Sequence, residues 1–130
     1  MPIQIKRAYD KPAASDGKRF LVDHLWPRGV SKARLKAEAW LKQVAPSDVL
    51  RKRFCHDPKK WEQFRTRYSA ELEHHQEDLQ PLLDAAHEGQ VTLLYGARDT
   101  QYNNALVLKD YLEKRLKMGT GKRQAAKKTR

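Results

Sequence analysis

The chain has 130 residues, of which 39% are hydrophobic and 33% charged, and its formal net charge is +11. This length fits one domain with a single core, and no apolar stretch approaches the roughly 20 residues of a transmembrane helix, so we expect no membrane partner. The first residues lack the apolar segment of a secretory signal, and one cysteine, Cys55, excludes an internal disulfide, so a cytoplasmic protein is expected.

The positive charge is unevenly distributed along the chain. Residues 117–130 hold six basic residues and no acidic ones, whereas residues 1–116 hold 21 basic and 16 acidic residues. The last segment is rich in Gly, Lys and Thr and has no apolar periodicity, which predicts a disordered basic tail after a domain over residues 1–116. Such a tail either binds nucleic acid weakly through its phosphates or only keeps the protein in solution.

Two strands are predicted at the start of the chain. Residues 3–9 alternate with a period of two, and residues 19–26 combine branched and aromatic side chains, as a buried strand does. The segment DKPAASDG at 10–17 between them has turn chemistry, in which Gly17 readily adopts a positive φ. The segment PRG at 27–29 ends the second strand.

Helices are predicted in the middle of the chain. Ser31 can cap a helix that runs through residue 44, and Ser47 can cap a short helix over residues 48–54. The first segment places apolar side chains on one helical face, either Leu41 with Val44 or Ala37 with Trp40 and Val44.

A further helix is predicted to begin at Asp57 and Pro58, because an N-cap followed by proline is a typical helix start. Pro81 is expected to end or kink this helix, and a last helical piece then closes at Gly89. Its apolar stripe has spacings of three and four residues and consists of Trp61, Phe64, Tyr68 and Leu72.

The compact apolar segment 91–96 predicts a strand, and an amphipathic helix is expected from about Asn103 onward. Strands separated by long helical segments favour parallel pairing, because a parallel crossover needs about a dozen residues or more. The sequence therefore predicts a small single-domain α/β fold, with a short, mostly parallel sheet of about three to four strands flanked by helices.

Polar residues follow the strand 91–96 directly, in the segment YGARDTQYNN. Ligands of open α/β sheets bind outside the carboxyl ends of the strands, and this segment occupies that position. Gly96 allows a sharp turn, the following helix start attracts anions, and Arg98 suits a carboxylate or phosphate. The alternative is structural, with Asp99 or Asn103 capping the helix and Arg98 paired with an acid.

The second strand also ends in a polar cluster, which contains Asp23, Arg28 and Gly29. Two such clusters at the ends of different strands predict one shared cleft. Arg7 on the first strand either joins this cleft or forms a structural ion pair with Asp23, since a buried arginine needs a partner.

Three segments of the chain resemble the domain-of-unknown-function family 488 (DUF488), in its short bacterial branch. They are RFLVDHLWPRGVSK (19–32), APSDVLRKRFCHDPKKWEQFRTRYSAEL (45–72) and VTLLYGARDTQYNNALVL (91–108), with the motifs WPRG, HDP-x-x-W and LLYGARD. The resemblance spans about residues 3–116 and implies a cytoplasmic bacterial α/β domain whose biochemical role is not settled. The motif positions are Asp23, Arg28, Gly29, His56, Asp57, Tyr95, Gly96, Arg98 and Asn104.

Longer relatives in that family carry a cysteine where this chain has Tyr95, so a cysteine mechanism does not carry over from them. Cys55 and His56 are adjacent in sequence, which favours a helix entrance over a nucleophile and its base. His74 and His75 are also adjacent and lack the i, i+4 spacing of zinc ligands, so neither a metal nor another cofactor is expected.

The leading hypothesis is a pocket at the strand ends that binds a small phosphate- or carboxylate-bearing molecule, with or without acting on it chemically. The expected ligand-binding residues are Arg7, Arg28, Gly29, Gly96, Arg98 and Asn104. The candidates for proton transfer or orientation are Asp23, His56, Tyr95 and Asp99.

Two other functions stay open. The first is nucleic-acid binding through residues 117–130 together with residues 51–54, Arg65 and Arg67. The second is protein interaction with a vestigial pocket. The sequence predicts no oligomeric state.

Overall fold

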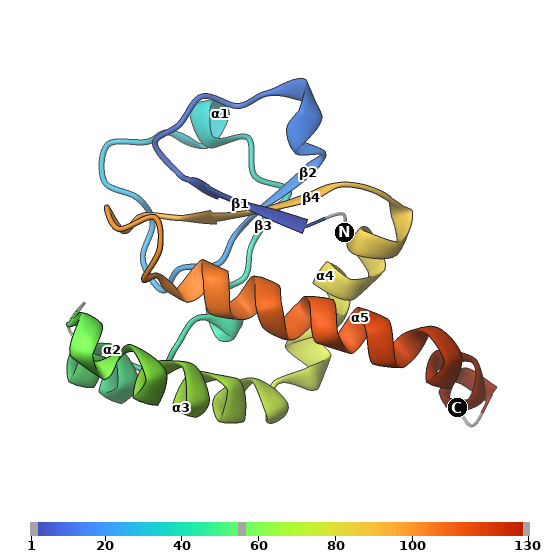
Figure 1. Ribbon diagram of the computed structural model, residues 1–130. Coiled ribbons are helices and arrows are strands. Elements are labelled where there is room, and N and C mark those ends of the chain that lie inside the picture. The colour runs from blue at the N-terminus through green and yellow to red at the C-terminus, as the bar shows by residue number, and fades with distance from the viewer. Residues whose placement is uncertain (1–2, 55–56, 129–130) are drawn as a thin grey trace.

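The computed structural model describes residues 3–54 and 57–128. Its centre is a sheet of four parallel strands in the order β1-β4-β2-β3 (Figure 1). The strands are β1 (Ile3–Arg7), β2 (Lys18–Leu21), β3 (Ala39–Trp40) and β4 (Val91–Tyr95). All five residues of β4 are buried, because β4 lies between two strands and is covered on both faces. The predicted α/β class and the short parallel sheet are confirmed.

One face of the sheet is covered by helices. α4 (Gln76–Glu88) and α5 (Asn104–Lys128) contact the strands, and α3 (Trp61–Glu73) packs on α5 with α2 (Asp48–Phe54) beside it (Figure 1). The 3-10 turn η3 (Pro58–Lys60) leads into α3. The predicted stripe packs here: Phe64, Tyr68 and Leu72 are buried, and Trp61 is partly buried against the same core.

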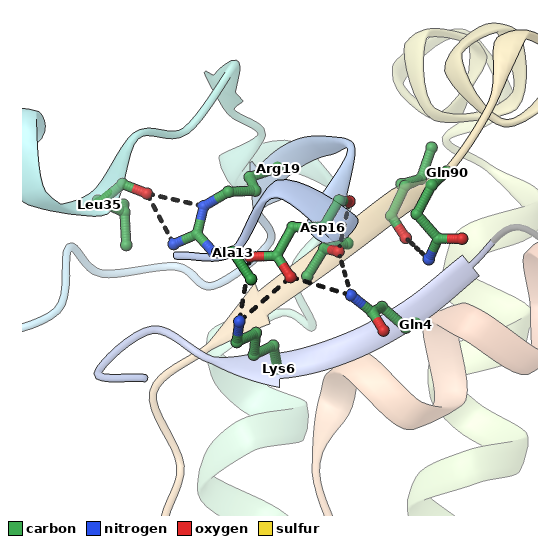
Figure 2. A network of polar contacts seen from close by, with 9 residues as sticks. Gln4, Lys6, Ala13, Asp16, Arg19, Leu35 and Gln90 are labelled. Carbon is green, nitrogen blue, oxygen red and sulfur yellow. Dashed lines mark hydrogen bonds and ion pairs between the residues drawn. The ribbon is translucent and has the colours of Figure 1, made fainter. Parts of the chain in front are cut away.

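The other face is covered mainly by loops. The covering segments are residues 8–17, which include the 3-10 turn η1 (Ala14–Asp16), and residues 22–38, which include α1 (Lys32–Leu35). A small apolar cluster lies under these loops beside a network of buried polar side chains around Asp16 (Figure 2). The apolar cluster consists of Ala8, Leu21, Val30, Leu35 and Leu94.

The prediction of one helix through residue 44 is wrong. α1 ends at Leu35, because Lys36 adopts a left-handed φ of 53°. The following residues then form β3, where Leu41 N–H donates to the Leu21 carbonyl 2.8 Å away, and a 3-10 turn η2 (Lys42–Val44). Pairing with β2 thus prevails over the helical spacing of the apolar residues.

The predicted position of the break near Pro81 is also wrong. α3 ends at Glu73, and α4 begins at Gln76 with Pro81 inside it. Pro81 lacks the N–H that would bond to the carbonyl four residues earlier, so α4 continues past it with one hydrogen bond fewer. The turn is made by His74 and His75, whose backbone N–H groups donate back to Glu71 and Leu72.

The backbone of residues 117–128 continues α5, where the sequence predicted a disordered tail. Lysine, arginine, glutamine and alanine all have high helix propensity, so this composition is compatible with helix despite Gly119 and Gly121. The division of the chain at residue 116 stays a prediction. Within the described part of the chain, no helix has both the length and the apolar composition that crossing a membrane requires.

Candidate functional site

Asp23 joins three elements at the carboxyl edge of the sheet. One carboxylate oxygen, Oδ2, accepts from the Gly96 N–H after β4 at 2.7 Å, and the other, Oδ1, accepts from Asn104 Nδ2 at the start of α5 at 3.1 Å. Trp40 Nε1 donates to the Asp23 carbonyl at 2.9 Å. The two strand ends that the sequence predicts to share one cleft are therefore in contact, and Asp23 is the side chain that connects them.

Gly96 permits this contact by having no side chain. A Cβ atom at this position would lie 3.2 Å from Asp23 Oδ2, closer than most Cβ contacts. Gly29 has a different role, because its φ is 79° and the space around it is open. Its left-handed backbone closes the turn in which the Val30 N–H donates to the Pro27 carbonyl.

The loop between β4 and α5 is held by its own side chains. Asp99 Oδ1 accepts from the backbone N–H groups of Gln101 and Tyr102 at 2.8 and 2.9 Å. Asn103 Oδ1 accepts from the Leu106 N–H at 2.9 Å, which is the bond of a helix N-cap. The structural alternative for Asp99 and Asn103 is therefore visible in the hydrogen bonds of this loop.

The three predicted arginines have different surroundings. Arg7 Nε donates to the Ala97 carbonyl at 3.0 Å, and its guanidinium lies 5.1 Å from the centre of the Tyr9 ring. Arg28 and Arg98 are exposed, and neither has a hydrogen bond or ion pair among the described residues. Their loops leave the carboxyl ends of β2 and β4, at the same edge of the sheet.

Three of the four candidates for proton transfer or orientation lie within electrostatic reach of one another, because the Asp99 and Asp23 carboxylates both act on the Tyr95 phenol. Tyr95 is only 2% exposed and belongs to the helix-covered core. Burial raises the pKa of its phenol, and nearby Arg7 only partly opposes this, so the group stays protonated at neutral pH. His56 lies outside the described residues. A catalytic role for any of these groups stays a prediction.

A pocket of about 390 Å³ opens beside Asp23, on the helix-covered side of the strand ends. Its volume lies within the usual range of small-molecule sites, about 300–1,000 Å³. Of the predicted residues, Asp23 and Asn104 line it, whereas Arg7, Arg28 and Arg98 do not. The other described lining residues are His24, Leu25, Pro46, Arg51, Lys52, Phe54, Phe64, Ala97 and Asn103.

The basic groups of this pocket come from α2, which the sequence did not assign to it. Arg51 Nη2 is bound to Asp48, whereas Arg51 Nε is buried and has no hydrogen-bond acceptor among the described residues. The hydrogen bond from Arg51 lowers the pKa of the Asp48 carboxyl, so Asp48 is ionised at neutral pH. His24 Nε2 lies 3.6 Å from the same carboxylate.

Aromatic side chains form the apolar wall of the pocket. The Phe54 and Phe64 rings are stacked with their centres 4.4 Å apart, and the Trp61 ring packs against both. The pocket thus combines an apolar wall with a guanidinium and an ammonium group. Among residues 3–54 and 57–128, no three His, Cys, Asp or Glu side chains are close enough to hold a metal ion.

Comparison with known proteins finds one matching family model and several relatives of similar length. The family model described as "Inactive DUF488-N3 subclade" matches residues 2–129. The uncharacterized protein YeaO of Escherichia coli (strain K12) is 46% identical over 112 residues, which are 86% of this chain and 97% of YeaO. No solved structure matches the chain.

Two mycobacterial proteins are more distant relatives. The uncharacterized proteins Mb3100c of Mycobacterium bovis and Rv3073c of Mycobacterium tuberculosis are each 34% identical over 113 residues. These residues are 87% of this chain and 95% of either relative. The similarity therefore extends over nearly the whole length of each relative.

Proposed function

This chain belongs to the DUF488 family, and we propose that it binds a small anionic molecule in the pocket beside Asp23, without needing to transform it. The description of the matching subclade as inactive supports a binding role. The position of Tyr95, where longer relatives carry a cysteine, supports it as well.

The observation that carries this proposal is the unsatisfied donor of Arg51. A buried N–H without an acceptor costs about 1–3 kcal/mol, so buried donors are nearly always paired. Arg51 lines the pocket, and its Nε has no acceptor among the described residues. An oxygen of a carboxylate or phosphate in the pocket would supply that acceptor, with Lys52 adding a second positive charge.

The rest of the pocket defines the shape of the ligand. Phe54 and Phe64 present an apolar wall that favours a planar or aliphatic body next to the acidic group. The negative charge of Asp23 opposes an anion, but each of its oxygens already accepts a hydrogen bond from Gly96 or Asn104. We therefore place the anionic group of the ligand at Arg51 and its apolar body toward the phenylalanines.

Arg28 and Arg98 are expected to contact the ligand at the mouth of the pocket. Both are exposed and have no partner among the described residues, and their loops leave the edge at which the pocket opens. Their contribution is expected to be smaller than that of Arg51, because an exposed guanidinium gains less from pairing than a partly buried one.

Titration of the protein with phenyl phosphate, followed by nuclear magnetic resonance, tests the proposal. We expect saturable binding, at least about tenfold weaker binding in Arg51→Gln, and a loss of only about two- to threefold in Arg28→Ala/Arg98→Ala, since tenfold corresponds to about 1.4 kcal/mol. Inorganic phosphate, which lacks the ring, should bind more weakly than phenyl phosphate.

Lys59→Gln is the matched control, because Lys59 is exposed and does not line the pocket. Thermal unfolding of each variant verifies that it is folded. Undiminished binding in a folded Arg51→Gln variant would refute the pocket as the site of the anion. Loss of binding only in Arg28→Ala/Arg98→Ala would show that the anion binds at the loops after β2 and β4 instead of at Arg51.

A further inference from the structure

We infer that the surface formed by Arg53, Lys60 and Arg67 docks on the phosphate backbone of double-stranded nucleic acid. We call this surface, which spans α2, η3 and α3, the α2–α3 basic surface. It is separate from the pocket beside Asp23, because none of its three cations lines that pocket.

The first reason is where the charge lies along the domain. Residues 51–67 hold seven basic and two acidic residues, whereas the rest of residues 1–116 holds fourteen of each. The whole excess positive charge of the domain therefore falls between the second half of α2 and the first half of α3. A charge excess of one sign on one part of a surface attracts polyanions.

The second reason is that three of these cations converge. Arg53, Lys60 and Arg67 line one shallow hollow between α2 and α3, and no carboxylate is among its described lining residues. Lys60 Nζ donates to the Arg53 carbonyl at 3.1 Å, which holds the lysine beside α2. Gln63 and Arg67 are four residues apart on α3 and so share one helical face, and Lys60 lines the same hollow from the end of η3.

The third reason is that two neighbouring arginines are held in ion pairs, whereas Arg53 and Arg67 are not. Arg51 is paired with Asp48, and Arg65 with Glu62. Arg53 and Arg67 are exposed and have no ion-pair partner within the described ranges. Unpaired arginines are the groups from which phosphate contacts are built, because their planar fork fits phosphate oxygens.

The geometry favours duplex over single strands or membranes. Lys60 and Arg67 are seven residues apart, about 10 Å along a helix and thus about three base-pair steps. Base stacking needs a free aromatic ring, but the Trp61 ring is packed against Phe54, Phe64 and Tyr102.

Membrane insertion needs exposed apolar side chains in the contact surface. The exposed large hydrophobic residues of the described chain do not line this hollow; they are Tyr9, Leu25, Val49 and Met118. Phosphate contacts without base contacts make the predicted binding independent of nucleotide sequence.

The basic end of α5 is a separate candidate for the same partner. α2 and the end of α5 lie at opposite ends of the helical layer (Figure 1). The contributions of the two regions can therefore be measured independently by neutralising one at a time.

The test is fluorescence anisotropy of a labelled DNA duplex of mixed sequence with the full chain, over a series of salt concentrations. We expect binding at low salt with an affinity that falls as salt rises. Arg53→Gln/Lys60→Gln/Arg67→Gln should weaken binding at least about tenfold and reduce the slope of log K against log salt by about 2.7, which is about 0.9 for each lost phosphate contact.

The matched control removes the same charge elsewhere. Lys11, Lys32 and Arg34 are exposed on the loop-covered side, and their triple change to glutamine should weaken binding less than about threefold, through long-range attraction alone. Circular dichroism of both variants verifies that they are folded.

Four outcomes would overturn the inference. They are no binding at low salt, equal losses in the two triple variants, a loss of binding only when Lys122, Arg123, Lys127 and Lys128 are changed to glutamine, and equally tight binding of polyglutamate. Binding of phenyl phosphate should be unchanged in the Arg53/Lys60/Arg67 variant, so this test and the test of the pocket can fail separately.

Discussion

The two faces of the sheet are built by opposite chemical means. Neighbouring residues of β2 show the contrast: Phe20 enters the apolar core under the helices, whereas Arg19 is buried under the loops at 5% exposure. Helices satisfy their own backbone and can present apolar side chains to the sheet. Loops bring unpaired backbone carbonyls with them, and these need donors.

Arg19 is the donor that the loop-covered face requires. Its Nε and Nη2 both donate to the Leu35 carbonyl at the end of α1, at 2.9 and 2.7 Å, and its Nη1 donates to Asp16 at 2.6 Å (Figure 2). Asp16 also accepts from Lys6 Nζ at 3.1 Å and from the Ala13 N–H at 3.0 Å. One buried carboxylate thus ties two loops and two strands together.

The two faces should therefore lose stability in different ways when they are mutated. The helix-covered face is held by close packing of apolar side chains, so the free energy of unfolding that a substitution removes should increase with the volume of the cavity that it leaves. The loop-covered face is held by buried polar groups that all have partners. Removing one partner of a buried ion pair should therefore lower the free energy of unfolding more than removing both.

The largest effect is expected from Asp16→Ala. This change leaves Arg19 buried without its carboxylate, and breaking a buried ion pair in this way costs about 3–5 kcal/mol. Urea unfolding measures the loss. The double variant Asp16→Leu/Arg19→Met should recover much of the stability, and a loss below about 1 kcal/mol in Asp16→Ala would show that the polar network is dispensable.

A somewhat smaller effect is expected from truncating the two central leucines of β4. Leu93 and Leu94 are both fully buried, Leu93 facing the helices and Leu94 facing the loops. Leu→Ala costs about 2–5 kcal/mol depending on how far the surroundings relax, so we expect a greater loss in Leu93→Ala than in Leu94→Ala. The opposite order in chemical denaturation would mean that the loops are as rigid as the helices.

The smallest effect is a dependence of stability on pH. Burial alone would raise the pKa of Asp16, but its hydrogen bonds with the Ala13 N–H, Lys6 and Arg19 lower the pKa below the ordinary value of 3.8. Because the folded-state pKa is lower than the unfolded one, this stabilisation is complete above the unfolded value and is lost as pH falls through the folded value.

Asp16→Asn removes this titration. Its free energy of unfolding should therefore fall less on acidification than that of the unaltered protein, when both are measured from neutral pH down to about pH 2. Parallel curves for the two proteins would assign the acid sensitivity to other carboxylates.

Much of the fold could be predicted because its signals are local. The period of two in residues 3–9 predicted β1, and the apolar segment 91–96 predicted β4. The apolar stripe from Phe64 to Leu72 predicted α3. β3 could not be predicted, because its two residues are fixed by pairing with β2 after the left-handed turn at Lys36. Such pairing depends on contacts between distant parts of the chain.

The site itself stays a prediction, but the contact between the two polar loops that should form it was predicted from the sequence. The polar segments after the second strand and after residues 91–96 were expected to converge, and Asp23 does contact Gly96 and Asn104. Arg51 was not assigned to the pocket, because the position of α2 is set by tertiary packing with α3. The only signal in the sequence was the run of basic residues before Phe54, which equally suits an exposed surface.

The order of strands has a consequence for synthesis of the chain. β4 lies between β1 and β2, yet its residues 91–95 follow both by about seventy or more positions. A ribosome-bound chain that has not yet exposed residue 95 lacks the strand that joins β1 to β2, so β1 has no neighbour with which to pair and β2 has only the two-residue β3. Folding of the sheet must therefore wait until most of the chain has been translated, and fragments that stop before Val91 should remain unfolded and sensitive to proteases.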